Sequence, residues 1–325
     1  MNDTIKKYIQ QIDQEIYNLS FGRHPENLYD PIRYILQLGG KRIRPLLSVL
    51  AYSLFQNDYM KIVRPSLAVE VFHNFTLLHD DIMDKAPIRR GKPTVHHQWN
   101  ENTAILSGDV MLVRVYDLLL EVQPDKIHRV IKDFNNCAAQ VCEGQQMDMD
   151  FETQPRVSED EYIRMIRYKT AVLLGYSLSL GGILADANES DILLLTDFGI
   201  NLGIGFQLMD DLLDVFADNH KFGKQVGGDI ITNKKTLLLI TAIELTRGRE
   251  QEDLYRWIEM KNFDPAEKVQ AVKAIYEKTG IRELAIDKMN HYFSNAQQDL
   301  DKIAVSEGKK VDLRDLTDYL MKREN

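Results

Sequence analysis

The stretch HNFTLLHDDIMDKAPIRR, residues 73–90, decides how the rest of the chain is organised. Its apolar residues predict a helix, and Asp80, Asp81 and Asp84 come at the end of that helix. Side chains three or four residues apart share a helix face, so we expect these carboxylates to gather on one face. A cation must offset their repulsion, and Mg²⁺ suits hard oxygen ligands together with substrate phosphates. The two arginines that end the stretch would hold those phosphates.

A second copy of the aspartate motif makes this interpretation better than its alternative, a solvated acidic turn. The segment GFQLMDDLLDVF, residues 205–216, has Asp210, Asp211 and Asp214 at the same spacing after another apolar run. Apolar side chains fill the positions between these aspartates, which is unusual for a surface turn. Two such helices facing each other would line one cavity with carboxylates for several metal ions.

The composition predicts an all-α fold in a single domain over residues 1–325. Length alone suggests about two domains, but motifs that share metals must converge on one site. The chain is 44% apolar and has nine prolines, and it has few of the dipeptides that turn β-hairpins. Hydrophobic periodicity predicts helices over residues 1–20, 31–38, 46–55, 65–83, 105–122, 127–151, 159–185 and 191–217, with further amphipathic helices beyond residue 250.

Charge and cysteine content exclude several classes of function. The net charge of −9 argues against general nucleic-acid binding, which needs a basic surface. We see no signal peptide and no run of about 18 uncharged apolar residues, so no spanning helix is expected. Two cysteines are too few for a disulfide framework in so long a chain. These features predict a soluble protein of the cytoplasm.

Cationic residues at two further places suggest phosphate binding. A glycine pair precedes Lys41, Arg42 and Arg44, and a glycine turn lets the backbone approach an anion closely. The alternative is that these cations complement a helix end. Lys169 lies in the middle of the helix predicted over residues 159–185, where a buried lysine is costly unless it is paired. An anionic ligand is the interpretation we favour for that lysine.

The segment after the second motif, residues 217–240, is rich in glycine and lysine. It is typical of a mobile lid that closes on a diphosphate, although a plain flexible connection would have the same composition.

In order, these motifs resemble those of the trans-isoprenyl diphosphate synthases, the polyprenyl synthetase family. The resemblance covers about residues 30–245, and the motifs that carry it are GGKRIRP (39–45), HNFTLLHDDIMD (73–84), RRGKPT (89–94), the pair Lys169–Thr170, GFQLMDDLLD (205–214) and FGKQVGGD (222–229). One departure is TNKKT, where many relatives have a second Gly-Lys pair. The resemblance implies an all-α bundle around a deep central cavity and a homodimer.

The resemblance also implies a reaction and a role for each site residue. The reaction is the condensation of isopentenyl diphosphate with an allylic diphosphate, with roughly three Mg²⁺ per active site. The implied metal ligands are Asp80, Asp84 and Asp210, supported by Asp81, Asp211 and Asp214. The implied allylic-diphosphate ligands are Arg89, Lys169, Lys224 and Gln207, and those of isopentenyl diphosphate are Lys41, Arg44, His73 and Arg90. Thr170 and Lys234 complete the substrate-binding set.

Physical chemistry agrees with that reaction. Ionising an allylic diphosphate needs charge stabilisation of the leaving group and a dry chamber for the carbocation, but no protein nucleophile. The growing chain would run along the first motif helix, so Phe72, Phe75 and Thr76 are expected to set its length. The resemblance connects an aromatic residue five before the motif with a farnesyl or geranylgeranyl product.

Two other functions compete with this one. A class I terpene cyclase also has an aspartate-rich helix, but it normally lacks a second DDxxD motif and an isopentenyl site. A non-catalytic subunit of a heteromeric synthase tends to lose aspartates, and none is missing here.

Overall fold

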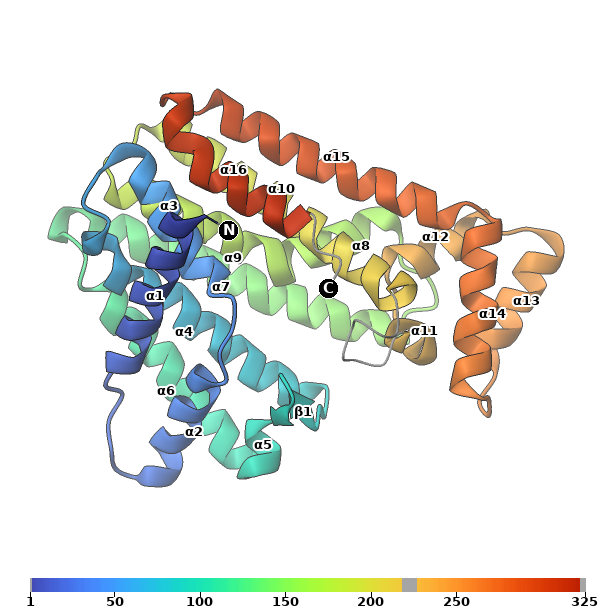
Figure 1. Ribbon diagram of the computed structural model, residues 1–325. Helices are drawn as coiled ribbons and strands as arrows, with labels where there is room; N and C mark the ends of the chain where they lie inside the picture. The colour runs from blue at the N-terminus through green and yellow to red at the C-terminus, as the bar shows by residue number, and fades with distance from the viewer. Residues whose placement is uncertain (1, 218–226, 322–325) are drawn as a thin grey trace. The chain divides into compact units, whose positions relative to one another are not determined.

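The computed structural model describes residues 2–217 and 227–321, and the chain there is almost entirely helical (Figure 1). The all-α class predicted from the sequence is therefore confirmed. The elements are α1 (Asp3–Asn18), α2 (Glu26–Gln37), α3 (Ile43–Phe55), α4 (Met60–Met83), β1 (Ile88–Arg89), β2 (Lys92–Pro93), α5 (Val95–Gln98), α6 (Glu101–Leu119), α7 (Pro124–Thr153), α8 (Glu159–Ile166), the π-helix η1 (Arg167–Ala171), α9 (Val172–Leu184), α10 (Glu189–Phe216), α11 (Gly228–Thr232), α12 (Leu237–Leu245), α13 (Gly248–Glu259), α14 (Pro265–Lys278), α15 (Ile281–Lys302) and α16 (Glu307–Met321).

Contacts divide the chain into two compact units. Unit 1 comprises residues 1–136, 176–196 and 303–315, and unit 2 comprises residues 137–175, 197–302 and 316–325. Helices α7, α9, α10 and α16 each have residues in both units. Each unit is described by itself below.

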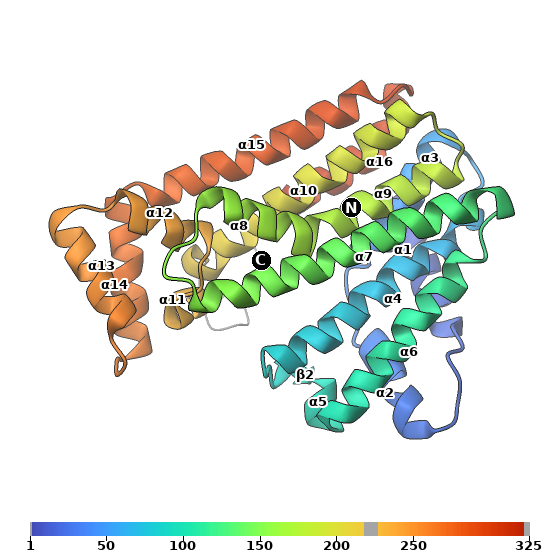
Figure 2. The same cartoon turned by 180° about the vertical axis from the view of Figure 1, so that it is seen from behind.

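Helix α4 is the central element of unit 1. Its residues from 62 to 72 are apolar almost all round, and Ile62, Leu67, Val71 and Phe72 are at most 1% exposed. A helix without a polar face must be covered on every side, and α4 packs along α6, α3 and α1 (Figures 1 and 2). The first aspartate motif therefore ends a rigid, deeply buried helix.

The core of unit 2 surrounds the part of α10 that carries the second motif. Leu208 and Leu212 of α10 belong to one apolar cluster with side chains of α8, α12 and α14, among them Tyr162, Leu238 and Tyr276. Helix α8 begins with the capping box that the sequence contains, because Ser158 and Glu161 exchange hydrogen bonds. The second motif is thus also attached to a well-packed helix.

Three helices begin earlier than the sequence predicted, each with a proline inside. Helix α2 begins at Glu26, α3 at Ile43 and α4 at Met60. The first backbone N–H groups of a helix have no partner within it, so a proline in the first turn, such as Pro45, loses nothing. Pro31 and Pro65 lie in the second turn and cost one hydrogen bond each, which the buried faces of these helices offset.

The segment after the first motif has a regular structure. Strands β1 and β2 form a hairpin in which Ile88 pairs with Pro93 and Arg89 with Lys92. Arg90 and Gly91 between them have φ angles of 52° and 73°. Two positive φ angles in a two-residue loop are what a type I′ turn requires.

One face of helix α6 is exposed although it carries apolar residues. The exposed fractions of Ile105, Leu106, Val113 and of Leu120, the residue directly after the helix, lie between 42% and 59%. The last three residues are seven apart, so they form one apolar stripe on the surface of unit 1. Periodicity identified the helix, but it did not show that these apolar residues are left uncovered.

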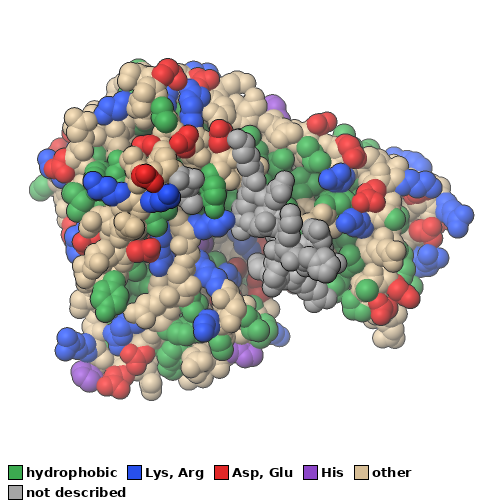
Figure 3. Space-filling model, in the orientation of Figure 1, with side chains coloured by type: hydrophobic (Ala, Val, Ile, Leu, Met, Phe, Trp, Pro, Cys, Tyr) green, Lys and Arg blue, Asp and Glu red, His purple; other side chains and the backbone are tan. Residues whose placement is uncertain are grey.

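Helix α10 is long and apolar enough, by length and composition alone, to cross a membrane. The expectation that the chain has no spanning helix therefore does not follow from helix length and composition alone. However, 56% of its apolar window is buried inside the structure, which is the pattern of a core helix. On the face shown in Figure 3, acidic and basic side chains are interspersed and do not form a single basic surface.

Candidate active site

One carboxylate of the first aspartate motif is paired with an arginine that follows the motif. Asp80 and Asp84 lie one helical turn apart, and the Asp84 N–H donates to the Asp80 carbonyl over 2.9 Å where α4 ends. The side chain of Asp81 is buried, and its two oxygens accept hydrogen bonds of 2.9 Å from Arg89 Nε. Asp81 thus holds Arg89 in place, and the common face of the three carboxylates stays a prediction.

The hairpin positions the paired arginines in different surroundings. Arg89 contacts Asp81 through Nη2 as well, over 2.8 Å. Arg90, in the turn, donates a hydrogen bond from Nη1 to the carbonyl of Gly39. Arg89 thus connects the hairpin to the end of α4, and its neighbour Arg90 connects the hairpin to the glycine turn before α3.

Three of the residues predicted to bind isopentenyl diphosphate gather within unit 1. His73 lies on α4, Arg44 in the first turn of α3, and Arg90 in the hairpin. Burial lowers the pKa of His73 well below its usual value, and the nearby charges of Arg44 and Arg90 lower it further. Burial also lowers the pKa of Arg90. This group of cations around a neutral imidazole is an environment that an anion would stabilise.

Lys41, the fourth predicted ligand, is exposed at the glycine turn. Arg42, which the sequence grouped with the phosphate-binding cations, is buried and pairs with Asp13 and Glu70.

The second aspartate motif is held by hydrogen bonds within unit 2. Asp211 is 5% exposed and accepts hydrogen bonds from the Tyr162 hydroxyl and, over 3.1 Å, from Gln207 Nε2. Asp214 accepts a 2.9 Å bond from the backbone N–H of Asp229 at the start of α11. The motif thereby fixes the segment that follows residue 226, and Asp210 lies beside it on α10.

Asp229 was not chosen from the sequence, although it ends the FGKQVGGD motif. Burial and then the carboxylate of Asp229 raise the pKa of Asp211 to about 7. The pKa of Asp229 itself is raised to about 6, chiefly by burial, while Lys234 opposes the rise in both groups. Lys234 therefore lies near Asp211 and Asp229, and its role as a diphosphate ligand stays a prediction.

Lys169 and Thr170 occupy a π-helix, where the sequence predicted an uninterrupted α-helix. Lys169 Nζ pairs with Asp148 Oδ2 at 2.6 Å, and Thr170 Oγ1 donates to Gln207 Oε1 over 3.2 Å. The partner of Lys169 in this structure is thus a carboxylate of α7. π-Helical turns are rare and often mark functional sites, and no pattern in the sequence reveals one.

Two of the three residues expected to set chain length, Phe72 and Phe75, lie in a row of contacting aromatic rings. The ring of Phe75 lies 5.6 Å from Phe72 and 4.7 Å from His79, measured between centroids. Phe72 in turn contacts Phe134 at 5.1 Å. Thr76 donates a hydrogen bond of 2.8 Å to the His73 carbonyl.

The carboxylates that the structure describes fit Mg²⁺ as hard oxygen donors. No three His, Cys, Asp or Glu side chains within residues 2–217 and 227–321 form a ready-made metal cage. Mg²⁺ does not need one, because it takes one or two carboxylates and completes its shell with water and phosphate oxygens. The Asp229 carboxylate helps to raise the pKa of Asp211, and this is the kind of repulsion that a divalent cation relieves.

Two predictions about the site concern residues outside the described ranges or residues that belong to different units. Lys224 and part of the predicted lid, residues 218–226, lie outside the described residues. The first motif belongs to unit 1 and the second to unit 2, so their convergence on shared metals stays a prediction.

Comparisons with known proteins identify the family. The family described as Polyprenyl synthetase matches residues 25–278. The geranylgeranyl pyrophosphate synthase of Geoglobus acetivorans is 36% identical over 334 residues, which cover 100% of both chains. A short chain isoprenyl diphosphate synthase of Methanocaldococcus jannaschii is 38% identical over 271 residues, covering 83% of this chain and 82% of that one.

A solved structure of a geranylgeranyl pyrophosphate synthase has a TM-score of 0.95 and 42% identity, with 100% of both chains covered. The chain therefore belongs to the polyprenyl synthetase family, and the prediction that it is a prenyltransferase of the isoprenyl diphosphate synthase class is confirmed.

Proposed function

We propose that this protein condenses isopentenyl diphosphate with an allylic diphosphate in a trans, head-to-tail reaction. The bond between C1 and the diphosphate oxygen of the allylic substrate breaks, and C1 forms a new bond with the double bond of isopentenyl diphosphate. The released diphosphate then takes up a proton from the carbon next to the cation, which restores a double bond. The observation that carries the proposal is the group of Arg44, His73 and Arg90, because a terpene cyclase has no second diphosphate to bind.

The side chains of unit 1 would hold isopentenyl diphosphate and one part of the metal site. Lys41, Arg44 and Arg90 supply positive charge. The imidazole of His73 has one N–H group in its neutral form, so it can donate a hydrogen bond without becoming protonated a second time. Asp80 and Asp84 would be metal ligands, while Asp81 keeps the Arg89 guanidinium oriented.

The side chains of unit 2 would act on the allylic diphosphate. Asp210 would be a metal ligand, supported by Asp211 and Asp214, and Lys169, Gln207 and Lys234 would contact the diphosphate, with Thr170 orienting Gln207. Lys224 is proposed for the same role. When bound by these aspartates, roughly three Mg²⁺ would neutralise charge on the departing diphosphate.

The test is an assay of the purified full chain with labelled isopentenyl diphosphate, Mg²⁺ and dimethylallyl, geranyl or farnesyl diphosphate, followed by sizing of the products. We expect elongated prenyl diphosphates that disappear when a chelator removes the metal. A hydrocarbon made from farnesyl diphosphate alone would indicate a cyclase. The absence of product with every primer would indicate a non-catalytic subunit.

Phe75→Ala is expected to lengthen the product beyond the farnesyl or geranylgeranyl diphosphate that we propose for the wild type. The aromatic ring would no longer block the path along α4, and Phe72, packed on Phe134, would become the next barrier. Chromatography of the dephosphorylated products measures the change. The exposed Tyr17→Ala serves as control, and an unchanged product spectrum for Phe75→Ala would discard the assignment.

We also propose that the chain forms a homodimer through the apolar stripe of α6, consisting of Leu106, Val113 and Leu120. These three exposed apolar side chains on one helix face would be covered in a dimer. The double variant Leu106→Lys/Val113→Lys is expected to be monomeric by light scattering, whereas Leu284→Lys/Val311→Lys, at exposed apolar positions elsewhere, stays dimeric. A monomeric wild type would contradict the proposal.

Two coarser assignments complete the proposal. Both cysteines are free thiols, which suits the reducing conditions of the cytoplasm. We treat the chain as a single domain, since four helices contribute residues to both units.

A further inference from the structure

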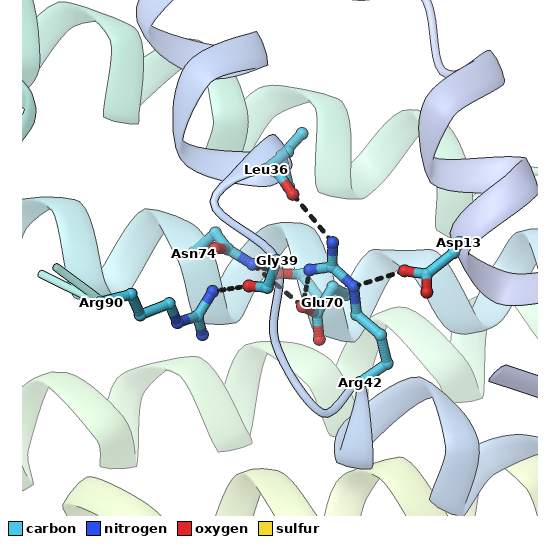
Figure 4. A network of polar contacts seen from close by, with 7 residues as sticks. All are labelled: Asp13, Leu36, Gly39, Arg42, Glu70, Asn74 and Arg90. Carbon is cyan, nitrogen blue, oxygen red and sulfur yellow. Dashed lines mark hydrogen bonds and ion pairs between the residues drawn. The ribbon is translucent and has the colours of Figure 1, made fainter. Parts of the chain in front are cut away.

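Each of the three nitrogens of the Arg42 guanidinium forms a hydrogen bond within the protein. The side chain is only 4% exposed. It donates from Nε to Asp13 over 2.9 Å, from Nη1 to Glu70 over 2.7 Å and from Nη2 to the Leu36 carbonyl over 2.8 Å (Figure 4). Because this guanidinium is buried and bonded to the protein through every nitrogen, we assign it a role other than direct contact with a diphosphate.

The backbone of Arg42 is also unusual. It has a φ angle of 49° and forms the N-cap of α3, and residues other than glycine adopt this left-handed conformation at a cost. The cost is sustained only where surrounding contacts hold the residue. Here the ion pairs of the side chain do so, and they set the point at which α3 begins, directly before Arg44.

The glycine turn is held at its other side by Arg90. The Arg90 guanidinium donates to the Gly39 carbonyl, and a Cβ at Gly40 would lie 3.1 Å from both of its terminal nitrogens. The turn thus lies between Arg90 and Arg42 (Figure 4), and Lys41 is the residue between the two fixed points.

Glu70 connects this arrangement to α4. Its carboxylate also accepts a hydrogen bond of 3.2 Å from Asn74 Nδ2, whose second acceptor, at 2.8 Å, is the Glu70 carbonyl. Glu70 lies three residues before His73 on the same helix. Arg42 therefore fixes Lys41 and Arg44 relative to His73, and Asp13 extends the network to α1.

We propose that Arg42 is a positioning residue for isopentenyl diphosphate, and that α1, through Asp13, is part of this positioning network. The inference rests on the proposed function of the site. Arg42 touches no substrate; it holds the turn so that Lys41 and Arg44 face the same diphosphate as His73 and Arg90. Loss of the network would weaken isopentenyl diphosphate binding selectively, because its hydrogen bonds join Asp13, Leu36, Gly39, Glu70 and Asn74 to the two arginines and include none of the residues assigned to the allylic diphosphate.

Asp13→Asn is the mildest test, because Asp13 is 52% exposed and its loss leaves Arg42 paired with the buried Glu70. We expect the KM for isopentenyl diphosphate to rise about tenfold, with kcat and the KM for the allylic substrate within about twofold of wild type. Arg42→Lys, which keeps the charge but not the planar fork, should raise the same KM further. Asp3→Asn, at a fully exposed position of the same helix, should change neither constant.

Calorimetric titration of the full chain with isopentenyl diphosphate alone separates this inference from the proposed function. If the wild type binds the ligand but makes no product, the proposed function fails, and the affinities of wild type and Asp13→Asn still decide the inference. Equal affinities, equal rises in both KM values, or no binding by the wild type would each overturn it. A lower melting temperature with unchanged KM values would show that the network serves stability alone and would overturn it too.

Discussion

Replacing Asp80 or Asp210 with alanine is expected to reduce turnover by roughly a thousandfold or more while the fold survives. Each change removes a proposed metal ligand, and charge stabilisation of the leaving diphosphate is nearly all that this chemistry requires. Stability should not fall, because each substitution also removes one charge from an acidic cluster. Initial rates with saturating substrates and Mg²⁺, together with circular dichroism, measure both effects.

Asp287→Ala is the matched control, since Asp287 is an exposed aspartate of α15 outside both motifs. Full activity in either motif variant would count heavily against shared metals. If only Asp80→Ala were inactive, the first motif would act without the second, and the convergence of the two motifs would be the part of the proposal to abandon.

Gly144→Ala is expected to lower kcat/KM by about a hundredfold, although Gly144 is not a proposed substrate contact. A Cβ there would lie 2.2 Å from the backbone nitrogen of Lys169 and 2.7 Å from the carbonyl carbon of Tyr168. Backbone atoms cannot rotate away, so the π-helix must shift and carry Lys169 and Thr170 with it. The forced contact should also cost about 1–3 kcal/mol of stability, which thermal unfolding measures.

Gly308→Ala provides the control, because a Cβ at Gly308 has nothing within 4 Å. In a helix, a change from glycine to alanine otherwise stabilises by up to about 1 kcal/mol, so the two variants should move the melting temperature in opposite directions. Rates for Gly144→Ala that equal those of wild type, measured well below its melting temperature, would show that catalysis tolerates a displaced π-helix.

Much of the fold could be predicted because it depends on local patterns. Apolar periodicity located the helices, and Ser158 with Glu161 predicted the start of α8 correctly. The errors arose where tertiary packing overrides local rules. Helices α2 and α4 continue through Pro31 and Pro65 because their buried faces offset a lost hydrogen bond, and a single sequence does not show how much burial each face will gain.

The site residues divide in the same way. Spacing identified the aspartates, but it did not show that Asp81 is buried under Arg89 or that Lys169 pairs with Asp148 across two helices. Arg42 looked like its neighbours, because sequence gives the charge of a residue and not the direction of its side chain. Only a residue's partners in space distinguish a cation that binds ligand from one that supports the backbone.

The hairpin turn at Arg90 and Gly91 has a consequence for protein engineering. Asn-Gly is the pair that this turn prefers, and Arg90→Asn would relieve a left-handed arginine while deleting a cation next to His73. A redesign that selects for thermal stability alone would favour this substitution, and it would lower the affinity of the protein for isopentenyl diphosphate. At this position robustness and affinity make opposite demands, so a directed-evolution campaign for heat resistance should leave Arg90 unmutated.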